Sequence, residues 1–207
     1  LERRLEKEFG LREVIIVGEN SSEDGMKESL GEAAARYLEY TIKDGNIVGV
    51  SMGSTLFEVV CHVVHPAAQK VTFVPLVGGV GRVRMELHAN SLAESLSRIY
   101  DGKFVPLHAP ARVSSRNIRD ELVKEDSLLP AIYLTQKLDI AVVGIGYPNE
   151  KSAIMATGYF KENEIESLID RKVAGELCMQ FYDIYGDTAP YKDDNNVIGM
   201  DISMLRS

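Results

Sequence analysis

Residues 44–56 read Asp-Gly-Asn-Ile-Val-Gly-Val-Ser-Met-Gly-Ser-Thr-Leu, and this stretch decides the fold. Asp44-Gly45 is a turn signal, and the short apolar run Asn46–Val50 predicts a buried strand. After Gly53, apolar residues recur at helical spacing over Thr55–Val64. A strand that passes through a glycine turn into a helix predicts a βα unit of a parallel sheet.

The same alternation of strand and helix patterns extends in both directions along the chain. Each early strand is a short and nearly continuous apolar run, which is typical of a parallel sheet covered on both faces. Strands are predicted for residues 13–17, 46–50, 71–75, 103–107 and 139–145, and late strands for 177–185 and 197–201. Helices are predicted for residues 1–9, 26–43, 55–64, 86–100, 115–124, 127–136 and 162–169. We therefore predict one α/β domain over residues 1–207, with a mostly parallel sheet and helices on both faces.

Composition narrows the class of protein. The chain has 207 residues and a formal net charge of −8, which argues against a broad surface that grips nucleic acid. It does not exclude a small anionic ligand, because that needs only one local site. Cys61 and Cys178 make no disulfide framework, and no apolar stretch approaches membrane-spanning length. These features predict a cytoplasmic protein that does not engage a membrane.

The loop after the strand at 46–50 is the first candidate site. Gly53 permits a tight turn, and Ser51, Ser54 and Thr55 supply hydroxyl groups. The free N–H groups of the following helix start favour an anion, so the loop is a candidate phosphate site. The alternative is an ordinary N-cap with a turn glycine.

A third interpretation of this loop is a hydrolase nucleophile. Gly49-x-Ser51-x-Gly53 matches the nucleophile elbow of α/β-hydrolases. In those enzymes the histidine follows the nucleophile and the acid along the chain, whereas the last histidine here is His108. The chain also lacks a His-Gly-Gly oxyanion motif, so the hydrolase interpretation is disfavoured.

Two further loops follow predicted strands. Gly78 and Gly79 let the backbone approach a ligand, and His88 and Asn90 offer hydrogen bonds to sugar hydroxyls. The alternatives are a simple turn and local helix capping. Gly144-Ile145-Gly146 resembles the start of a dinucleotide fingerprint, but its third glycine is missing. We therefore predict a pocket wall at Gly144 and Gly146 and no nucleotide cofactor.

The segment Cys61-His62-x-x-His65 contains residue types that bind metals. Structural zinc sites need four ligands at matched spacings, and no second cluster accompanies this one. We predict an exposed helix here and no metal.

Taken in order, several segments resemble the C-terminal sugar-binding domain of the SorC/DeoR-type bacterial transcriptional regulators. The segments are LERRLEKEFGLREVIIV, DGNIVGVSMGSTL, VPLVGG, HANSLAESLS, LDIAVVGIG and GELCMQFYD with a late IGM. The resemblance implies a Rossmann-like fold similar to ribose-5-phosphate isomerase and glucosamine-6-phosphate deaminase. It also implies binding of a phosphorylated sugar, assembly into a dimer or tetramer, and contact with operator DNA only through an N-terminal helix-turn-helix absent from this chain.

The resemblance also assigns residues. It places the phosphate at Ser51, Gly53, Ser54 and Thr55, and a carboxylate that accepts sugar hydroxyls at Glu176. One branch of the family has a ligand-facing Gln where this chain has His88. Relatives often carry Arg or Lys where this chain has Val77.

Relatives also continue past the IGM segment through a loop with a phosphate-contacting lysine. The resemblance therefore implies an incomplete C-terminal end and no positive partner for the phosphate, with Arg82 and Arg84 as candidate substitutes.

Two other functions remain open from the sequence. A sugar-phosphate isomerase or deaminase would need a general base near the sugar, and Asp139 and Glu176 are the available carboxylates. Asp139 opens its strand and so lies at the wrong end of the sheet. A domain used only for dimerisation is the other alternative.

Overall fold

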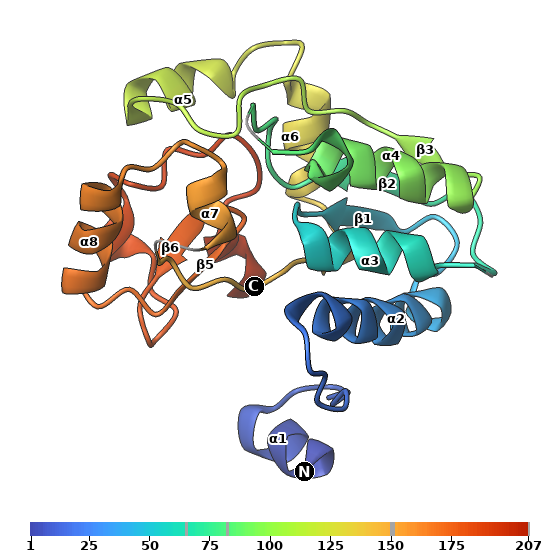
Figure 1. Cartoon of the computed structure of the whole chain (residues 1–207). Helices are drawn as coiled ribbons and strands as arrows, with labels where there is room; N and C mark the ends of the chain where they lie inside the picture. The colour runs from blue at the N-terminus through green and yellow to red at the C-terminus, as the bar shows by residue number, and fades with distance from the viewer. Residues whose placement is uncertain (65, 82, 150–151, 207) are drawn as a thin grey trace.

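The computed structural model describes residues 1–64, 66–81, 83–149 and 152–206 (Figure 1). Within these ranges it contains a four-stranded parallel sheet in the order β3-β2-β1-β4 and an antiparallel pair, β5-β6. The strands are β1 Ile47–Val50, β2 Thr72–Pro75, β3 Lys103–Phe104, β4 Ile140–Val142, β5 Gly175–Leu177 and β6 Gln180–Tyr182. The α-helices are α1 Glu2–Phe9, α2 Glu23–Thr41, α3 Ser54–His62, α4 Ala89–Ile99, α5 Arg116–Leu122, α6 Leu129–Thr135, α7 Ala153–Ala156 and α8 Glu162–Asp170. The 3-10 helices are η1 Met85–Leu87, η2 Ala189–Tyr191 and η3 Ile202–Arg206.

The parallel sheet is covered on both faces, as the apolar runs predict. Val48, Val50 and Phe73 are buried in a cluster with side chains of α2, α3 and α4. Val74 points to the opposite face and is buried in a cluster with Ala131 of α6. The α/β fold with a mostly parallel sheet is therefore confirmed. None of the helices in the described ranges is both long enough and apolar enough to cross a membrane.

Helices α2 and α3 lie side by side over this sheet (Figure 1). The N-cap of α2 is Ser22, whose Oγ accepts a hydrogen bond of 3.1 Å from the N–H of Gly25. The helices approach most closely at Gly31, where an added Cβ would lie 2.4 Å from Cβ of Glu58. A side chain at position 31 would therefore force the two helices apart.

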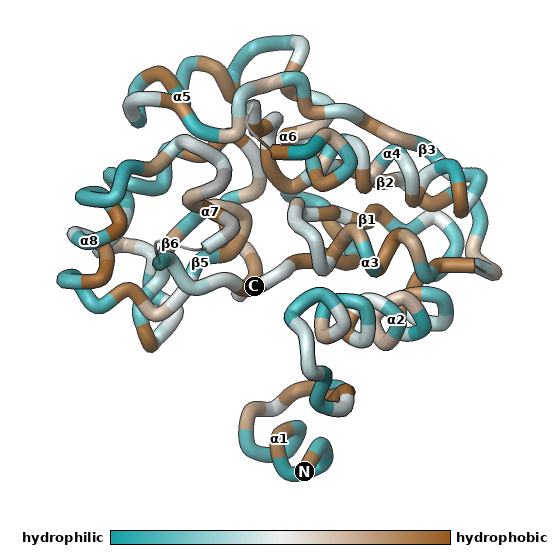
Figure 2. Tube along the Cα trace, in the orientation of Figure 1, coloured by the Kyte–Doolittle hydropathy of each residue, from teal (hydrophilic) through white to brown (hydrophobic). Residues whose placement is uncertain are grey.

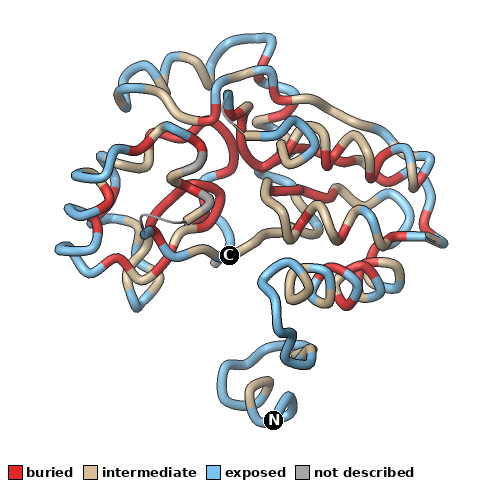
Figure 3. Tube along the Cα trace, in the orientation of Figure 1, coloured by how far each residue is buried: buried red, intermediate tan, exposed pale blue. Residues whose placement is uncertain are grey.

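The strand predicted for residues 13–17 is not present. Ile15 and Ile16 are 43% and 44% exposed, and α1 lies apart from the rest of the molecule (Figures 1 and 3). The backbone N–H groups of Val14 and Ile16 donate to carboxylates of α1 instead of to another strand. The prediction was wrong because β-branched residues form a strand only where a neighbouring strand completes the ladder.

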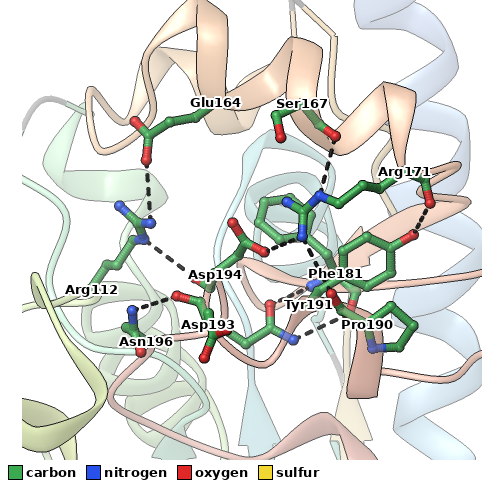
Figure 4. A network of polar contacts seen from close by, with 11 residues as sticks. Arg112, Glu164, Ser167, Arg171, Phe181, Pro190, Tyr191, Asp193, Asp194 and Asn196 are labelled. Carbon is green, nitrogen blue, oxygen red and sulfur yellow. Dashed lines mark hydrogen bonds and ion pairs between the residues drawn. The ribbon is translucent and has the colours of Figure 1, made fainter.

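The second part of the molecule is built around the β5-β6 hairpin, α7 and α8 (Figure 1). Arg112 donates to the carbonyl of Tyr159 at 3.1 Å and lies 3.5 Å from the carboxylate of Glu164 (Figure 4). Arg171 forms a 2.9 Å ion pair with Asp194. These arginines join α8 and the C-terminal segment around a core that appears as buried tube in Figure 3 and as apolar tube in Figure 2.

The predicted late strands are shorter in the structure. The segment 177–185 contains the turn of the β5-β6 hairpin, and 197–201 contributes only isolated bridges, Val77 to Gly199 and Arg112 to Val197. At the turn, Cys178 and Met179 have φ angles of +52° and +62°. Residues other than glycine seldom adopt this conformation, so the turn is strained.

Candidate functional site

A pocket of about 200 Å³ lies between the loops at the carboxyl ends of β1 and β4 and the β5-β6 hairpin. This is the edge at which parallel sheets bind ligands. The volume is below the usual range of about 300–1,000 Å³, which favours a small ligand. The pocket is lined by Glu23, Lys27, Ser51, Met52, Gly53, Ser54, Thr55, Leu56, Gly144, Ile145, Gly146, Ile154, Thr157, Glu176, Cys178 and Met179.

The loop after β1 forms one wall of this pocket. The N-cap of α3 is Gly53, with φ of +124°, and no side chain caps the helix. The N–H of Gly53 donates to the carbonyl of Leu87 at 3.1 Å. The N–H groups that begin α3 belong to Ser54 and Thr55, which line the pocket, and no acceptor for them is found among the described residues. An uncapped helix start of this kind offers hydrogen-bond donors and the positive end of the helix dipole.

Glu176 forms part of the opposite wall. Burial raises the pKa of its carboxyl group, and the hydrogen bond from the N–H of Met179, 3.1 Å long, opposes that rise. Gly146 lies beside it, because an added Cβ there would be 2.4 Å from Oε1 of Glu176. The backbones of the two residues exchange hydrogen bonds of 2.9 and 2.7 Å. Gly146 therefore leaves the space that the carboxyl group occupies.

Ser51 and Cys178 lie together at the buried end of the pocket. The thiol of Cys178 lies 3.4 Å from Oγ of Ser51, and both residues are buried. Burial raises the pKa of the Cys178 thiol to about 12, so the thiol stays protonated at neutral pH. A hydrolase would need a histidine beside Ser51, and no histidine lies among the described residues that line the pocket. This geometry does not support the nucleophile interpretation.

Four of the predicted ligand residues do not line the pocket. Gly78 and Gly79 pack against the segment at Ala109, whose carbonyl accepts the N–H of Gly79 at 2.8 Å. The amide of Asn90 donates to the carbonyl of Leu107 and accepts its N–H, at 3.1 and 3.0 Å. Nε2 of His88 lies 3.0 Å from the carbonyl oxygen of Val83. These groups hold loops in place, so the local interpretations of a turn and of side-chain bonding to the backbone fit the structure.

The remaining alternatives can be placed in the same way. Oδ2 of Asp139 accepts the N–H of Ile47 at 2.7 Å, at the amino end of the strands and away from the pocket. Cys61 is exposed on α3 and Nδ1 of His62 lies 2.8 Å from the carbonyl of Glu58, while His65 lies outside the described residues. No cluster of three metal-ligating side chains occurs in the part of the chain that the structure describes.

Sequence reasoning missed Lys27 and Glu23, which enter the pocket from the start of α2. Arg84, one of the predicted substitutes for a phosphate partner, instead pairs with Glu86 at 3.2 Å, and Arg82 lies outside the described residues. The sequence contains one signal that could have revealed Lys27. Gly31 lies inside a helical pattern, which indicates close packing against another element.

Comparison with known proteins agrees with this architecture. Residues 1–207 match the family described as "Putative sugar-binding domain". The chain is 24% identical over 205 residues to the deoxyribonucleoside regulator of Bacillus subtilis (strain 168), covering 98% of this chain and 64% of that protein. It is 25% identical over 213 residues to the sorbitol operon regulator of Klebsiella pneumoniae, covering 100% of this chain and 66% of that protein.

A solved structure is also similar. A DeoR family transcriptional regulator from Listeria monocytogenes superposes with a TM-score of 0.89 at 27% identity, covering 100% of this chain and 81% of that one. The chain spans about two thirds of the length of the two relatives above. Because the family match extends over residues 1–207 and the similar proteins are regulators, the chain belongs to the family of sugar-binding domains of SorC/DeoR-type transcriptional regulators.

Proposed function

We propose that this domain binds a phosphorylated sugar, with the phosphate at the start of α3. The observation that carries the proposal is the uncapped helix start at Gly53, which faces a pocket with the hydroxyl groups of Ser51, Ser54 and Thr55. A phosphate there accepts hydrogen bonds from backbone N–H groups and hydroxyls, and it meets the positive end of the helix dipole.

The sugar then extends toward β4 and the hairpin. The carboxyl group of Glu176 accepts hydrogen bonds from sugar hydroxyls, and the backbone at Gly144 and Gly146 forms the adjoining wall. The apolar side chains of Ile145, Ile154 and Met179 give the sugar ring or chain a surface to pack against. A few polar groups in a mostly apolar pocket are typical of small-molecule sites.

Ligand binding acts on the regulator without chemistry. The two parts of the molecule both contribute pocket residues, so a ligand that contacts both favours one arrangement of them. It can shift an equilibrium between assembly states only by its difference in affinity for those states. We propose that the domain assembles as a homodimer or tetramer and that the effector changes the affinity of the whole regulator for operator DNA, which a separate DNA-binding part contacts.

A thermal unfolding series tests the proposal. The ligands are ribose 5-phosphate, 2-deoxyribose 5-phosphate, sorbitol 6-phosphate and glucosamine 6-phosphate, each paired with its unphosphorylated parent. A ligand at 100 times its Kd stabilises the folded state by about 2.7 kcal/mol, which raises Tm by about 5–10 °C. We expect such a rise for at least one phosphorylated member and not for its parent.

Variants at two threonines complete this experiment. Thr55→Ala removes a hydroxyl from the pocket and should reduce the rise in Tm, whereas Thr41→Ala, the same change at the far end of α2, should leave it intact. If no phosphorylated sugar raises Tm, the proposal is wrong and the domain serves assembly alone. Conversion of ribose 5-phosphate or glucosamine 6-phosphate to product would instead favour an isomerase or deaminase.

A further inference from the structure

We propose that Lys27 is the cation that selects phosphorylated ligands in this pocket, and that it exchanges its partner Glu23 for the phosphate when the ligand binds. The inference rests on the proposed function and names the positive group that the phosphate site requires. Among the residues described as lining the pocket, Lys27 is the one Lys or Arg.

The crossing of two helices places Lys27 at the phosphate site. Gly31 of α2 packs directly on Glu58 of α3, with an added Cβ 2.7 Å from the Glu58 carbonyl carbon. Lys27 precedes Gly31 by four residues, and Ser54 precedes Glu58 by four, so each lies one turn earlier on its own helix. Both of these residues line the pocket. Because four residues return a helix to the same face, the glycine contact that brings the helices together also directs Lys27 toward the start of α3.

The present partner of Lys27 is held weakly. Nζ of Lys27 lies 2.6 Å from Oε1 of Glu23 and 4.0 Å from Oδ1 of Asp24. The side chain of Lys27 is 26% exposed, whereas that of Glu23 is 84% exposed and that of Asp24 is fully exposed. Ion pairs between exposed groups contribute little to stability, so separating this one costs little.

The charges explain why the exchange is favoured. A phosphate carries more negative charge than a single carboxylate, and a lysine ammonium makes stronger hydrogen bonds to it than to a neutral hydroxyl. Glu23 also lines the pocket, where its carboxylate repels an incoming anion. Its exposure lets it turn into solvent once Lys27 has left it. Lys27 thus favours the phosphorylated ligand, and Glu23 opposes it.

Calorimetric titration of purified variants tests this assignment by its sign. The ligands are inorganic phosphate and the four sugar phosphates with their parents. Lys27→Gln should weaken binding of the phosphorylated ligands by about tenfold or more, the usual loss for a hydrogen bond to a charged group, and leave binding of the parents unchanged. Glu23→Gln should instead strengthen binding of the phosphorylated ligands severalfold, because it frees the ammonium and removes a competing negative charge.

The same helix offers a matched control. Arg36 pairs with Glu32 at 3.0 Å with the same four-residue spacing, and neither residue lines the pocket. Arg36→Gln and Glu32→Gln should therefore leave every affinity unchanged. Lys27→Arg should retain most of the binding that Lys27→Gln loses.

The outcomes separate this inference from the function on which it rests. If the unaltered chain binds sugar phosphates, Thr55→Ala weakens them and Lys27→Gln does not, the phosphate site stands and the role of Lys27 is overturned. A Glu23→Gln variant that binds more weakly than the unaltered chain overturns the exchange of partners. If the unaltered chain binds no phosphorylated ligand, both the proposed function and this inference fail.

Discussion

The amide of Asn90 joins the start of α4 to the segment after β3, and it does so with both of its polar ends. Leu107, which it holds, is buried, so its backbone groups have no water to replace a lost partner. Asn90→Ala should destabilise the protein by about 1–3 kcal/mol, the cost of buried backbone groups left unsatisfied. Denaturant unfolding measures this loss, and ligand affinity should not change.

The matched control for this variant is Asn163→Ala, which changes an exposed asparagine on α8. It should leave stability within about 0.5 kcal/mol of the original value. A loss of ligand affinity in Asn90→Ala with unchanged stability would return Asn90 to the pocket.

Residue types alone predict the pocket only in part. Ser51, Ser54 and Thr55 could be placed because the carboxyl ends of parallel strands meet at one edge of a sheet. Asn90 has the chemistry of a sugar-binding residue, but a buried backbone elsewhere uses that chemistry first. The sequence does not reveal such a competing demand, because it depends on which loop passes beside the side chain.

At the scale of elements, the contact between α2 and α3 sets the position of one pocket wall. Gly31→Ala adds a methyl group 2.4 Å from Cβ of Glu58. Alanine favours helix by about 1 kcal/mol relative to glycine, but overpacking costs about 1–3 kcal/mol, so we expect a net loss of stability. The displaced α2 should also carry Lys27 away from Ser54, and affinity for sugar phosphates should fall.

Unfolding and titration of the Gly31→Ala variant measure the two effects. Glu32→Ala, an exposed change at the next position of α2, serves as the control and should alter neither quantity. A Gly31→Ala variant that is more stable than the original and binds equally well would mean that the two helices can separate freely.

Elements differ in how far local sequence determines them. Strands β1 and β2 lie within their predicted ranges, because their apolar runs are buried on both faces. The run at residues 13–17 has equally strong strand propensity, yet α1 carboxylates take two of its N–H groups. A helix forms its own hydrogen bonds, whereas a strand depends on a neighbour that its own residues do not specify.

At the scale of the whole molecule, stability should depend on pH through Glu176. Burial raises the pKa of this carboxyl group above its ordinary value of 4.5, so the folded chain holds a proton that the unfolded chain has released. Between these two pKa values the folded state binds more protons, and stability therefore falls as pH rises through that window. Glu176→Gln removes this dependence and retains an acceptor for the N–H of Met179.

The difference in Tm between Glu176→Gln and the original chain measures this effect. It should grow in favour of the variant as pH rises above 4.5 and become constant beyond the pKa of the folded state. Glu162→Gln, at an exposed position on α8, should show no such trend. A difference that is the same at every pH would mean that the Glu176 carboxyl group titrates equally in both states.

The hairpin turn at Cys178 and Met179 has a consequence for how such a sequence evolves. Asparagine and glycine adopt positive φ angles at much lower cost, so replacing the pair would relax a strain of order 1–3 kcal/mol per residue. Those two side chains, however, also close one end of the pocket. Selection for a durable fold alone would exchange them, whereas selection for ligand recognition keeps them, and stability and recognition therefore compete at this turn.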